Sequence, residues 1–249
     1  MAGYNGGANI ASLALAVKVE GLTKAFGSRI TLRGIDLEVK QGEAVALFGP
    51  NGAGKTTLLK VLATIMNPSS GKVFIDGLDA KESAEEARRR IGIVTHNTFL
   101  YSNLTAYENL DFYCKLYDVP GRQERIHQVV SLVGMTPRLH NRVATLSRGM
   151  QQRLSIARAL LHKPSIMLLD EPETGLDRQA NAMLWDIFRR EGEQKRTIIL
   201  TTHNLERGLE AAERVLILDK GSIVYDGLKR GLDLAALEKV YQASTGTEV

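Results

Sequence analysis

Gly49-Pro50-Asn51-Gly52-Ala53-Gly54-Lys55-Thr56 fits the pattern G-x-x-x-x-G-K-[ST], and this short run indicates the class of fold. Residues 44–48 before it are apolar and strand-like, and residues 55–66 after it have helical spacing. Its glycines let successive backbone N–H groups turn inward as an anion-binding nest, and the N-terminus of the helix adds positive potential. We therefore expect a phosphate site, in which Lys55 contacts the β- and γ-phosphates of a nucleoside triphosphate and Thr56 offers its hydroxyl to Mg²⁺. The expected nucleotide-binding residues are Gly49, Pro50, Asn51, Gly52, Ala53, Gly54, Lys55, Thr56 and Thr57.

The rest of the chain alternates between strand-like and helix-like segments. Strands are expected at 17–20, 31–39, 44–48, 72–75, 91–94, 166–169, 197–201 and 215–219, and helices at 55–66, 83–90, 179–190 and 205–212. Between about residues 98 and 162 the apolar spacing is helical. This order predicts an α/β fold, with a parallel sheet flanked by helices and a helical insert. We expect a single domain over 17–249 after a flexible extension, 1–16.

Composition limits the classes of protein that are possible. With 249 residues, 44% of them apolar and 24% charged, the chain can bury a sizeable core, which excludes a disordered or coiled-coil protein. The net charge of +4 is mild, and a solvated basic surface explains it better than a surface for lipid or nucleic acid. The single cysteine, Cys114, favours a reducing compartment. No run approaches the ~20 apolar residues of a membrane-spanning helix, and no secretory signal is expected.

A second chemical site follows the apolar run 166–169, which leads into Asp170 and Glu171. Because side chains alternate along a strand, the two carboxylates are expected to point in different directions. Asp170 can then face Mg²⁺, while Glu171 reaches the water in line with the γ-phosphorus and acts as a general base. Such a run is common at strand ends, but together with the phosphate loop (residues 49–56) it favours a catalytic site for triphosphate hydrolysis.

The segment Leu146-Ser147-Arg148-Gly149-Met150-Gln151-Gln152-Arg153 resembles the signature sequence of the ATP-binding subunits of ABC transporters, and the resemblance covers about residues 17–226. It implies a P-loop ATPase domain with an antiparallel β subdomain and a helical subdomain inserted in a RecA-like core. It also implies a homodimer around two ATP molecules, because in the family this helix start faces the γ-phosphate bound by the other subunit. Ser147 and Gly149 match the family pattern, whereas the residue after each departs from it.

Three further positions resemble functional residues of the family. His203 matches the switch histidine, which contacts the γ-phosphate and helps to position the attacking water. Asp177 ends Gly175-Leu176-Asp177, which resembles the loop that joins the two active sites across the dimer. Phe26 falls where the family places an aromatic side chain that stacks on adenine, although packing in the core is the alternative.

The clearest departure from the family follows residues 91–94, where a glutamine usually contacts Mg²⁺ or the attacking water and senses the membrane partner. His96 and Asn97 stand there instead. Imidazole is a poor ligand for Mg²⁺, whereas an asparagine carbonyl is acceptable though one methylene shorter than glutamine. We expect Asn97, or His96 through a water, to carry this role, and alignment favours His96. The apolar residues within 99–104 either dock the membrane subunit or pack on the helical insert.

The resemblance implies an ATP-hydrolysing subunit that drives separate transmembrane permease subunits from the cytoplasmic face of the membrane, as a peripheral protein. Within the family, residues 104–113 and 147–154 are most similar to the haem-exporter ATPases of cytochrome c maturation, which implies haem export. Exporters of drugs, polysaccharide or lipid share much of the pattern and are the alternative. A soluble ABC ATPase that acts on nucleic acid usually has long coiled coils or tandem ATPase units, which the sequence does not show, so no nucleic-acid partner is expected.

Overall fold

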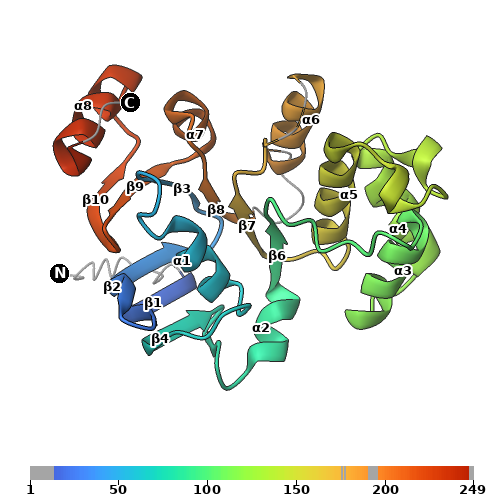
Figure 1. The fold of residues 1–249 in the computed structure, drawn as a ribbon, viewed down its shortest axis with the longest axis horizontal. Coiled ribbons are helices and arrows are strands. Elements are labelled where there is room, and N and C mark those ends of the chain that lie inside the picture. Colours follow the sequence, from blue (N-terminus) through green and yellow to red (C-terminus); the bar gives the residue numbers. More distant parts are fainter. Residues whose placement is uncertain (1–13, 175, 177, 190–195, 247–249) are drawn as a thin grey trace, which may run out of the picture.

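The computed structural model describes residues 14–174, 176, 178–189 and 196–246, which form two sheets and a group of helices (Figure 1). The strands are β1 (Leu15–Phe26), β2 (Arg29–Lys40), β3 (Ala44–Phe48), β4 (Ser70–Ile75), β5 (Leu78–Asp79), β6 (Ile91–Val94), β7 (Ile166–Asp170), β8 (Thr197–Thr201), β9 (Arg214–Asp219) and β10 (Ser222–Leu228). The helices are α1 (Lys55–Leu62), α2 (Ala84–Arg90), α3 (Ala106–Leu116), α4 (Arg122–Leu132), α5 (Arg148–Leu160), α6 (Arg178–Arg189), α7 (Leu205–Ala211) and α8 (Leu234–Thr245), with short 3₁₀ turns η1 (Thr136–Arg138) and η2 (Val143–Thr145). None of the helices in the described ranges combines the length and apolar content needed to cross a lipid bilayer.

The two sheets have different strand directions. One has the order β2-β1-β4-β5 and is antiparallel. The other has the order β10-β9-β3-β8-β7-β6, and all of its pairs are parallel except that of β10 with β9. All five residues of β3 and all five of β7 are buried, as parallel strands covered on both faces should be. The predicted α/β fold with an antiparallel β part is confirmed.

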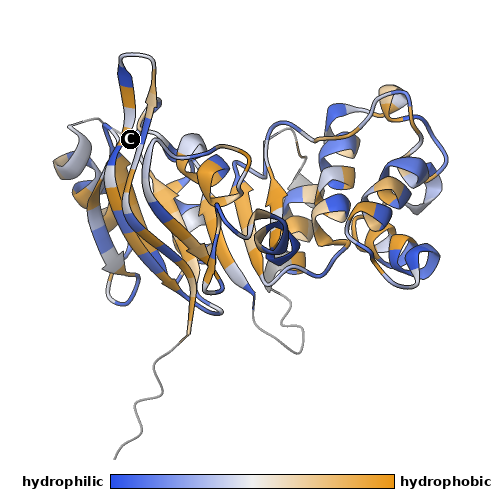
Figure 2. Cartoon of the chain, turned by 90° about the horizontal axis from the view of Figure 1, so that it is seen from below, coloured by the Kyte–Doolittle hydropathy of each residue, from blue (hydrophilic) through white to orange (hydrophobic). Residues whose placement is uncertain are grey.

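Helices α3, α4 and α5 form a lobe beside the parallel sheet, and apolar residues gather along the strands next to it (Figure 2). α3 packs on α4, α4 on α5, and α5 on β6. α3 begins with a capping box, in which the Thr105 side chain accepts the N–H of Glu108 and the Glu108 carboxylate accepts the N–H of Thr105. Leu110, Ile126 and Leu154 are fully buried between the helices. The lobe occupies the interval in which the sequence predicts a helical insert.

Several element boundaries differ from those predicted. β1 begins at Leu15, which pairs with Lys40, so two residues assigned to the N-terminal extension belong to the sheet. Residues 1–13 lie outside the described ranges. α1 ends at Leu62 rather than near Met66, because Thr64 adopts a left-handed conformation with a φ of 56°. The sequence did not predict β5, β10 or α8, since short edge strands and terminal helices have weak local signals.

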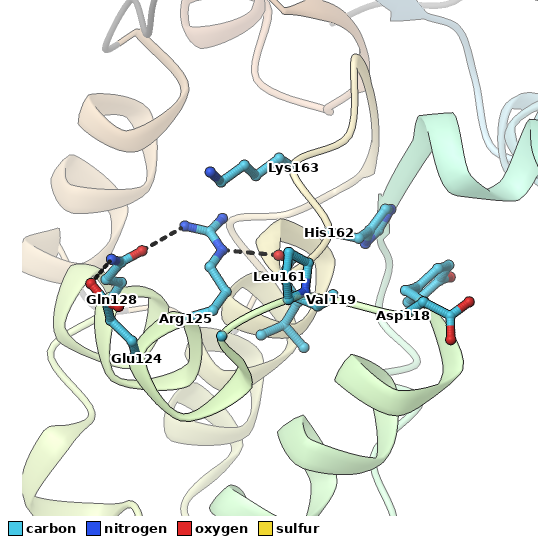
Figure 3. A pocket seen from close by; sticks show the side chains of 11 residues that line it. Asp118, Val119, Glu124, Arg125, Gln128, Leu161, His162 and Lys163 are labelled. Carbon is cyan, nitrogen blue, oxygen red and sulfur yellow. Dashed lines mark hydrogen bonds between the residues drawn. The ribbon is translucent and has the colours of Figure 1, made fainter.

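His162 lies where the helical lobe meets the parallel sheet, at a pocket of about 290 Å³ that Arg125 and Lys163 also line (Figure 3). Its ring stacks on Tyr117 with the centroids 4.0 Å apart, and its Nε2 lies 3.0 Å from the carbonyl oxygen of Ile91. Its Nδ1 is buried without a hydrogen-bond partner among the described residues. Burial, assisted by nearby arginines, lowers the pKa of His162 to about 4. The neutral ring is therefore the form that fits the folded chain.

We expect this histidine to make stability depend on pH. Because folding lowers the pKa of His162 from about 6.5 to about 4, the neutral ring contributes fully to the free energy of unfolding above pH 6.5. This contribution is lost as the pH falls toward 4. Between pH 7 and pH 5, the free energy of unfolding should fall by up to about 2 kcal/mol more in the parent chain than in His162→Gln. Glutamine keeps a donor for the Ile91 carbonyl but cannot titrate. Urea unfolding at both pH values measures the difference, and an equal fall in the two proteins would contradict it.

Candidate active site

The loops that follow β3, β7 and β8 meet at one edge of the parallel sheet (Figure 1). β3 pairs with β8 and β8 with β7, and Thr201 is in register with both Leu47 and Asp170. Because the strands are parallel, their carboxyl ends lie on the same side, which is where open α/β sheets bind ligands. The topology thereby brings together the phosphate loop, Glu171 and His203 from three distant parts of the sequence.

The phosphate loop follows β3 directly and turns on its glycines. Gly49 has a φ of 148°, and a Cβ there would lie 2.0 Å from the carbonyl oxygen of Leu218. Lys55 begins α1, and its Nζ donates to the carbonyl oxygens of Gly49 and Pro50 at 2.6 and 3.1 Å. Burial lowers the pKa of Lys55, and nearby carboxylates oppose this effect. The ammonium group thus points into the phosphate loop, where two carbonyl oxygens accept its hydrogen bonds.

Asp170 is buried at the end of β7 and is held by two hydroxyl groups. Thr201 Oγ1 donates to Asp170 Oδ1 at 2.7 Å, and Thr56 Oγ1 donates to the same oxygen at 3.1 Å. Carboxylate and hydroxyl oxygens are hard ligands of the kind that Mg²⁺ prefers, so Thr56 and Asp170 fit the metal role expected of them. The described ranges contain no group of three or more His, Cys, Asp or Glu side chains able to hold a metal ion.

Glu171 and His203 form a direct pair, with His203 Nε2 at 2.6 Å from Glu171 Oε1. Since an ionised carboxylate only accepts hydrogen bonds, Nε2 carries the hydrogen. Glu171 has a φ of 49°, which is uncommon for a residue with a side chain, and its N–H donates to the carbonyl oxygen of Thr201 at 3.0 Å. The surrounding structure therefore holds the carboxylate in a strained turn directly after β7.

A pocket of about 390 Å³ lies over the phosphate loop and reaches Glu171. Phe26 lines it with 48% of its surface exposed, so the ring is available for stacking. Lys24 Nζ lies 5.2 Å from the centroid of that ring. Arg29 and Thr31 line the same pocket, and neither is predicted from the sequence. Arg29 and Thr31 reach the pocket because the β1–β2 hairpin packs against the phosphate loop. No local sequence motif marks residues that are brought to a site in this way.

The signature residues do not line this pocket. Ser147 is the N-cap of α5, and its Oγ accepts the N–H of Met150 at 3.3 Å. Gly149 lies in the first turn of the same helix. Neither belongs to the residues around the phosphate loop pocket. Asp177, predicted at the junction between two active sites, lies outside the described residues.

His96 and Asn97 follow β6 at the same edge of the sheet and do not line the pocket. The His96 side chain is exposed. Asn97 Oδ1 accepts the N–H of Phe99 at 3.2 Å, and the N–H of Asn97 donates to the hydroxyl of Thr95 at 3.0 Å. The carbonyl expected to face Mg²⁺ is thus engaged within its own loop. The metal role of either residue stays a prediction.

Comparison with known proteins places this geometry in a family. The family described as ABC transporter matches residues 32–174. An uncharacterized ABC transporter ATP-binding protein of Bacillus subtilis, YdbJ, is 37% identical over 86% of this chain and 70% of its own length. The linearmycin resistance ATP-binding protein LnrL of Bacillus subtilis is 34% identical over 87% of this chain and 70% of its own length.

The fold has a close counterpart among solved structures. The dimeric post-hydrolysis state of an ATP-binding cassette bound to ADP and phosphate superimposes with a TM-score of 0.79 and 29% sequence identity, covering 87% of this chain and 100% of the other. Of the two Bacillus subtilis relatives, LnrL is named as a resistance protein and neither is named as a haem exporter. Their names therefore support another exporter over the expected haem exporter. The chain therefore belongs to the ABC transporter family, as an ATP-binding domain that hydrolyses ATP.

Proposed function

We propose that the chain is the ATPase subunit of an exporter, that two copies close around two ATP molecules, and that this cycle drives separate membrane subunits. The observation that carries the proposal is the meeting of Lys55, the Thr56–Asp170 pair and the Glu171–His203 pair at one edge of the sheet. Each has a separate role in phosphoryl transfer to water.

The reaction that this arrangement supports is the attack of water on the γ-phosphorus of ATP. Glu171 accepts the proton of the water, and the bond from the γ-phosphorus to the bridging oxygen breaks to release ADP. Lys55 leaves the carbonyl oxygens of the phosphate loop and stabilises charge on the phosphates. His203 keeps the Glu171 carboxylate oriented through Nε2. Mg²⁺, held by Thr56 and Asp170, would neutralise charge on the phosphate oxygens.

A second copy of the chain is needed to complete the site. Ser147 begins α5 in the helical lobe, away from the phosphate loop pocket of its own chain. The N-terminus of a helix is a suitable group to face a phosphate, and a partner's α5 can supply it. The similar solved cassette is described as dimeric, which supports this arrangement.

The membrane partner would contact an exposed aromatic surface of the helical lobe. Tyr101 and Phe112 are 51% and 40% exposed, and their rings meet edge to face with centroids 5.3 Å apart. Leu116, on the same helix as Phe112, is 57% exposed. Apolar side chains gathered in this way favour a protein partner over open solvent. The name of the linearmycin resistance relative supports a drug-like cargo, and haem export is not proposed.

We expect two inactive variants to restore each other's activity. Lys55→Ala removes the phosphate contact, and Ser147→Arg blocks the helix start that faces the partner's phosphate. A mixed dimer contains one site with both defects and one intact site, so an equimolar mixture should recover about a quarter of the parent ATPase rate, while each variant alone hydrolyses almost no ATP. Phosphate release from the purified proteins measures the rates.

The matched control is Ser131→Arg, which places the same side chain at an exposed serine at the end of α4. It should keep the parent rate. Full activity of Ser147→Arg alone, or no recovery in the mixture, would remove the shared site from the proposal. The other part of the proposal, that the chain drives separate membrane subunits, is tested by whether it associates with membranes only when permease subunits are co-expressed.

A further inference from the structure

The two loops that carry Glu171 and His203 are joined by a second link that the chemistry above does not use. Thr202 Oγ1 donates to Glu173 Oε1 at 2.5 Å. Glu173 comes two residues after Glu171, and Thr202 comes directly before His203. The loops after β7 and β8 are therefore connected side chain to side chain at two successive places.

The hydroxyl of Thr202 has a fixed direction. Its side chain is 2% exposed, and its methyl group packs so closely on α7 that a Cβ at Gly208 would lie 3.0 Å from it. Besides donating to Glu173, the hydroxyl accepts the N–H of Asn204 at 3.0 Å. Asn204 in turn caps α7 through the N–H of Arg207 at 2.8 Å. The hydroxyl therefore both donates and accepts a hydrogen bond, and the backbone on either side of His203 is held.

His203 needs such support because its own side chain is 53% exposed. An exposed imidazole has several rotamers open to it, and only some of them bring Nε2 to Glu171. Fixing the backbone at Thr202 and Asn204 restricts these choices. The Glu173–Thr202 link therefore acts on the geometry of the Glu171–His203 pair without touching substrate.

The hydrogen-bonding capacity of the Glu173 carboxylate is only partly used among the described residues. Its second carboxylate oxygen, Oε2, is buried and has no hydrogen-bond partner among the described residues. A buried acceptor without a partner destabilises the folded state. A role in activity accounts for a carboxylate at this place better than a role in folding does.

We propose that Glu173 and Thr202 are positioning residues for ATP hydrolysis, holding His203 against Glu171 through the hydrogen bond between the two loops. This inference rests on the proposed roles of Glu171 and His203 in hydrolysis. It adds two residues, one on each loop, that set the rate of the chemical step and not the affinity for ATP.

The test is steady-state ATP hydrolysis by the purified full chain. Thr202→Val keeps the branched shape and the methyl group but removes the hydroxyl, so kcat should fall by about tenfold while KM for ATP stays within about twofold. Thr202→Ser, which keeps the hydroxyl, should recover most of the rate. Glu173→Ala should match Thr202→Val, and the double variant should be no slower than either single variant, because both remove the same bond.

Thr197→Val is the matched structural control. Thr197 is also 2% exposed, lies at the opposite end of β8, and its hydroxyl accepts the N–H of Gly42 at 2.9 Å. Its replacement removes a buried threonine hydroxyl at the end of β8 that is farther from the site, so kcat should stay near the parent value. Equal kcat values in Thr197→Val and Thr202→Val would overturn the inference. So would effects of Thr202→Val and Glu173→Ala on kcat that add fully in the double variant.

His203→Ala separates this inference from the proposal beneath it. Slow hydrolysis in His203→Ala together with parent rates in Thr202→Val and Glu173→Ala would overturn the positioning role alone. Parent rates in His203→Ala as well would overturn the role proposed for the Glu171–His203 pair. Glu173→Ala also carries the test from the other loop if Thr202→Val does not fold.

Discussion

Glu171→Gln should slow ATP hydrolysis by about 10²–10³-fold, equivalent to about 3–4 kcal/mol of transition-state stabilisation, while ATP affinity stays within a few-fold of the parent chain. The amide has nearly the shape of the carboxylate, and its oxygen can still accept the hydrogen bond of His203 Nε2. What it loses is the ability to take the proton of the attacking water. The effect should therefore appear in kcat, and ATP-bound dimers should accumulate because the step that reopens them is slow.

Glu206→Gln is the control for the loss of one negative charge near the His203 loop. Glu206 is exposed in the first turn of α7 and does not line the pocket. The Glu206→Gln variant should hydrolyse ATP at the parent rate. Single-turnover phosphate release and titration with a fluorescent ATP analogue separate chemistry from binding. Turnover of Glu171→Gln within twofold of the parent chain would remove Glu171 from the mechanism.

Gly49→Ala should weaken ATP binding by about 100-fold or more and destabilise the fold by about 3 kcal/mol or more. The new Cβ would lie 2.0 Å from the carbonyl oxygen of Leu218, far inside van der Waals contact. That oxygen belongs to β9, which pairs with β3, so the strand cannot yield without loss of the sheet. The loop must move instead, and the backbone N–H groups that would bind phosphate move with it.

Gly77→Ala distinguishes this clash from backbone strain alone. Gly77 has a φ of 80°, so alanine is strained there too, but a Cβ at Gly77 has no neighbour within 4 Å. It should lower the free energy of unfolding by only about 1 kcal/mol and leave ATP affinity unchanged. Urea unfolding and ATP titration of both variants make the comparison. Similar ATP affinities in the two would show that the approach of Gly49 to β9 does not shape the site.

Local sequence was enough for the parts of the fold that depend on contiguous residues. The phosphate loop and the start of α1 at Lys55 follow from glycine and from helix chemistry within one short stretch. The buried strands β3 and β7 follow from apolar runs. β10 and α8 were missed, because an edge strand and a terminal helix owe their form to the elements on which they pack. The short stretches that point to a haem exporter are shared by many exporters, and the relatives support another exporter over haem export.

The groups able to do chemistry can be recognised from local patterns, because Lys55, Thr56, Asp170, Glu171 and His203 each stand in a motif or at a strand end. Which of these groups meet depends on how the strands are ordered in the sheet. The order β3-β8-β7 places His203 Nε2 at 2.6 Å from Glu171 Oε1 and Thr202 beside Glu173, and the packing of the β1–β2 hairpin on the phosphate loop brings Arg29 to the pocket. Strand neighbours are set by hydrogen bonding and burial between segments far apart in the chain, so no local pattern encodes the strand order.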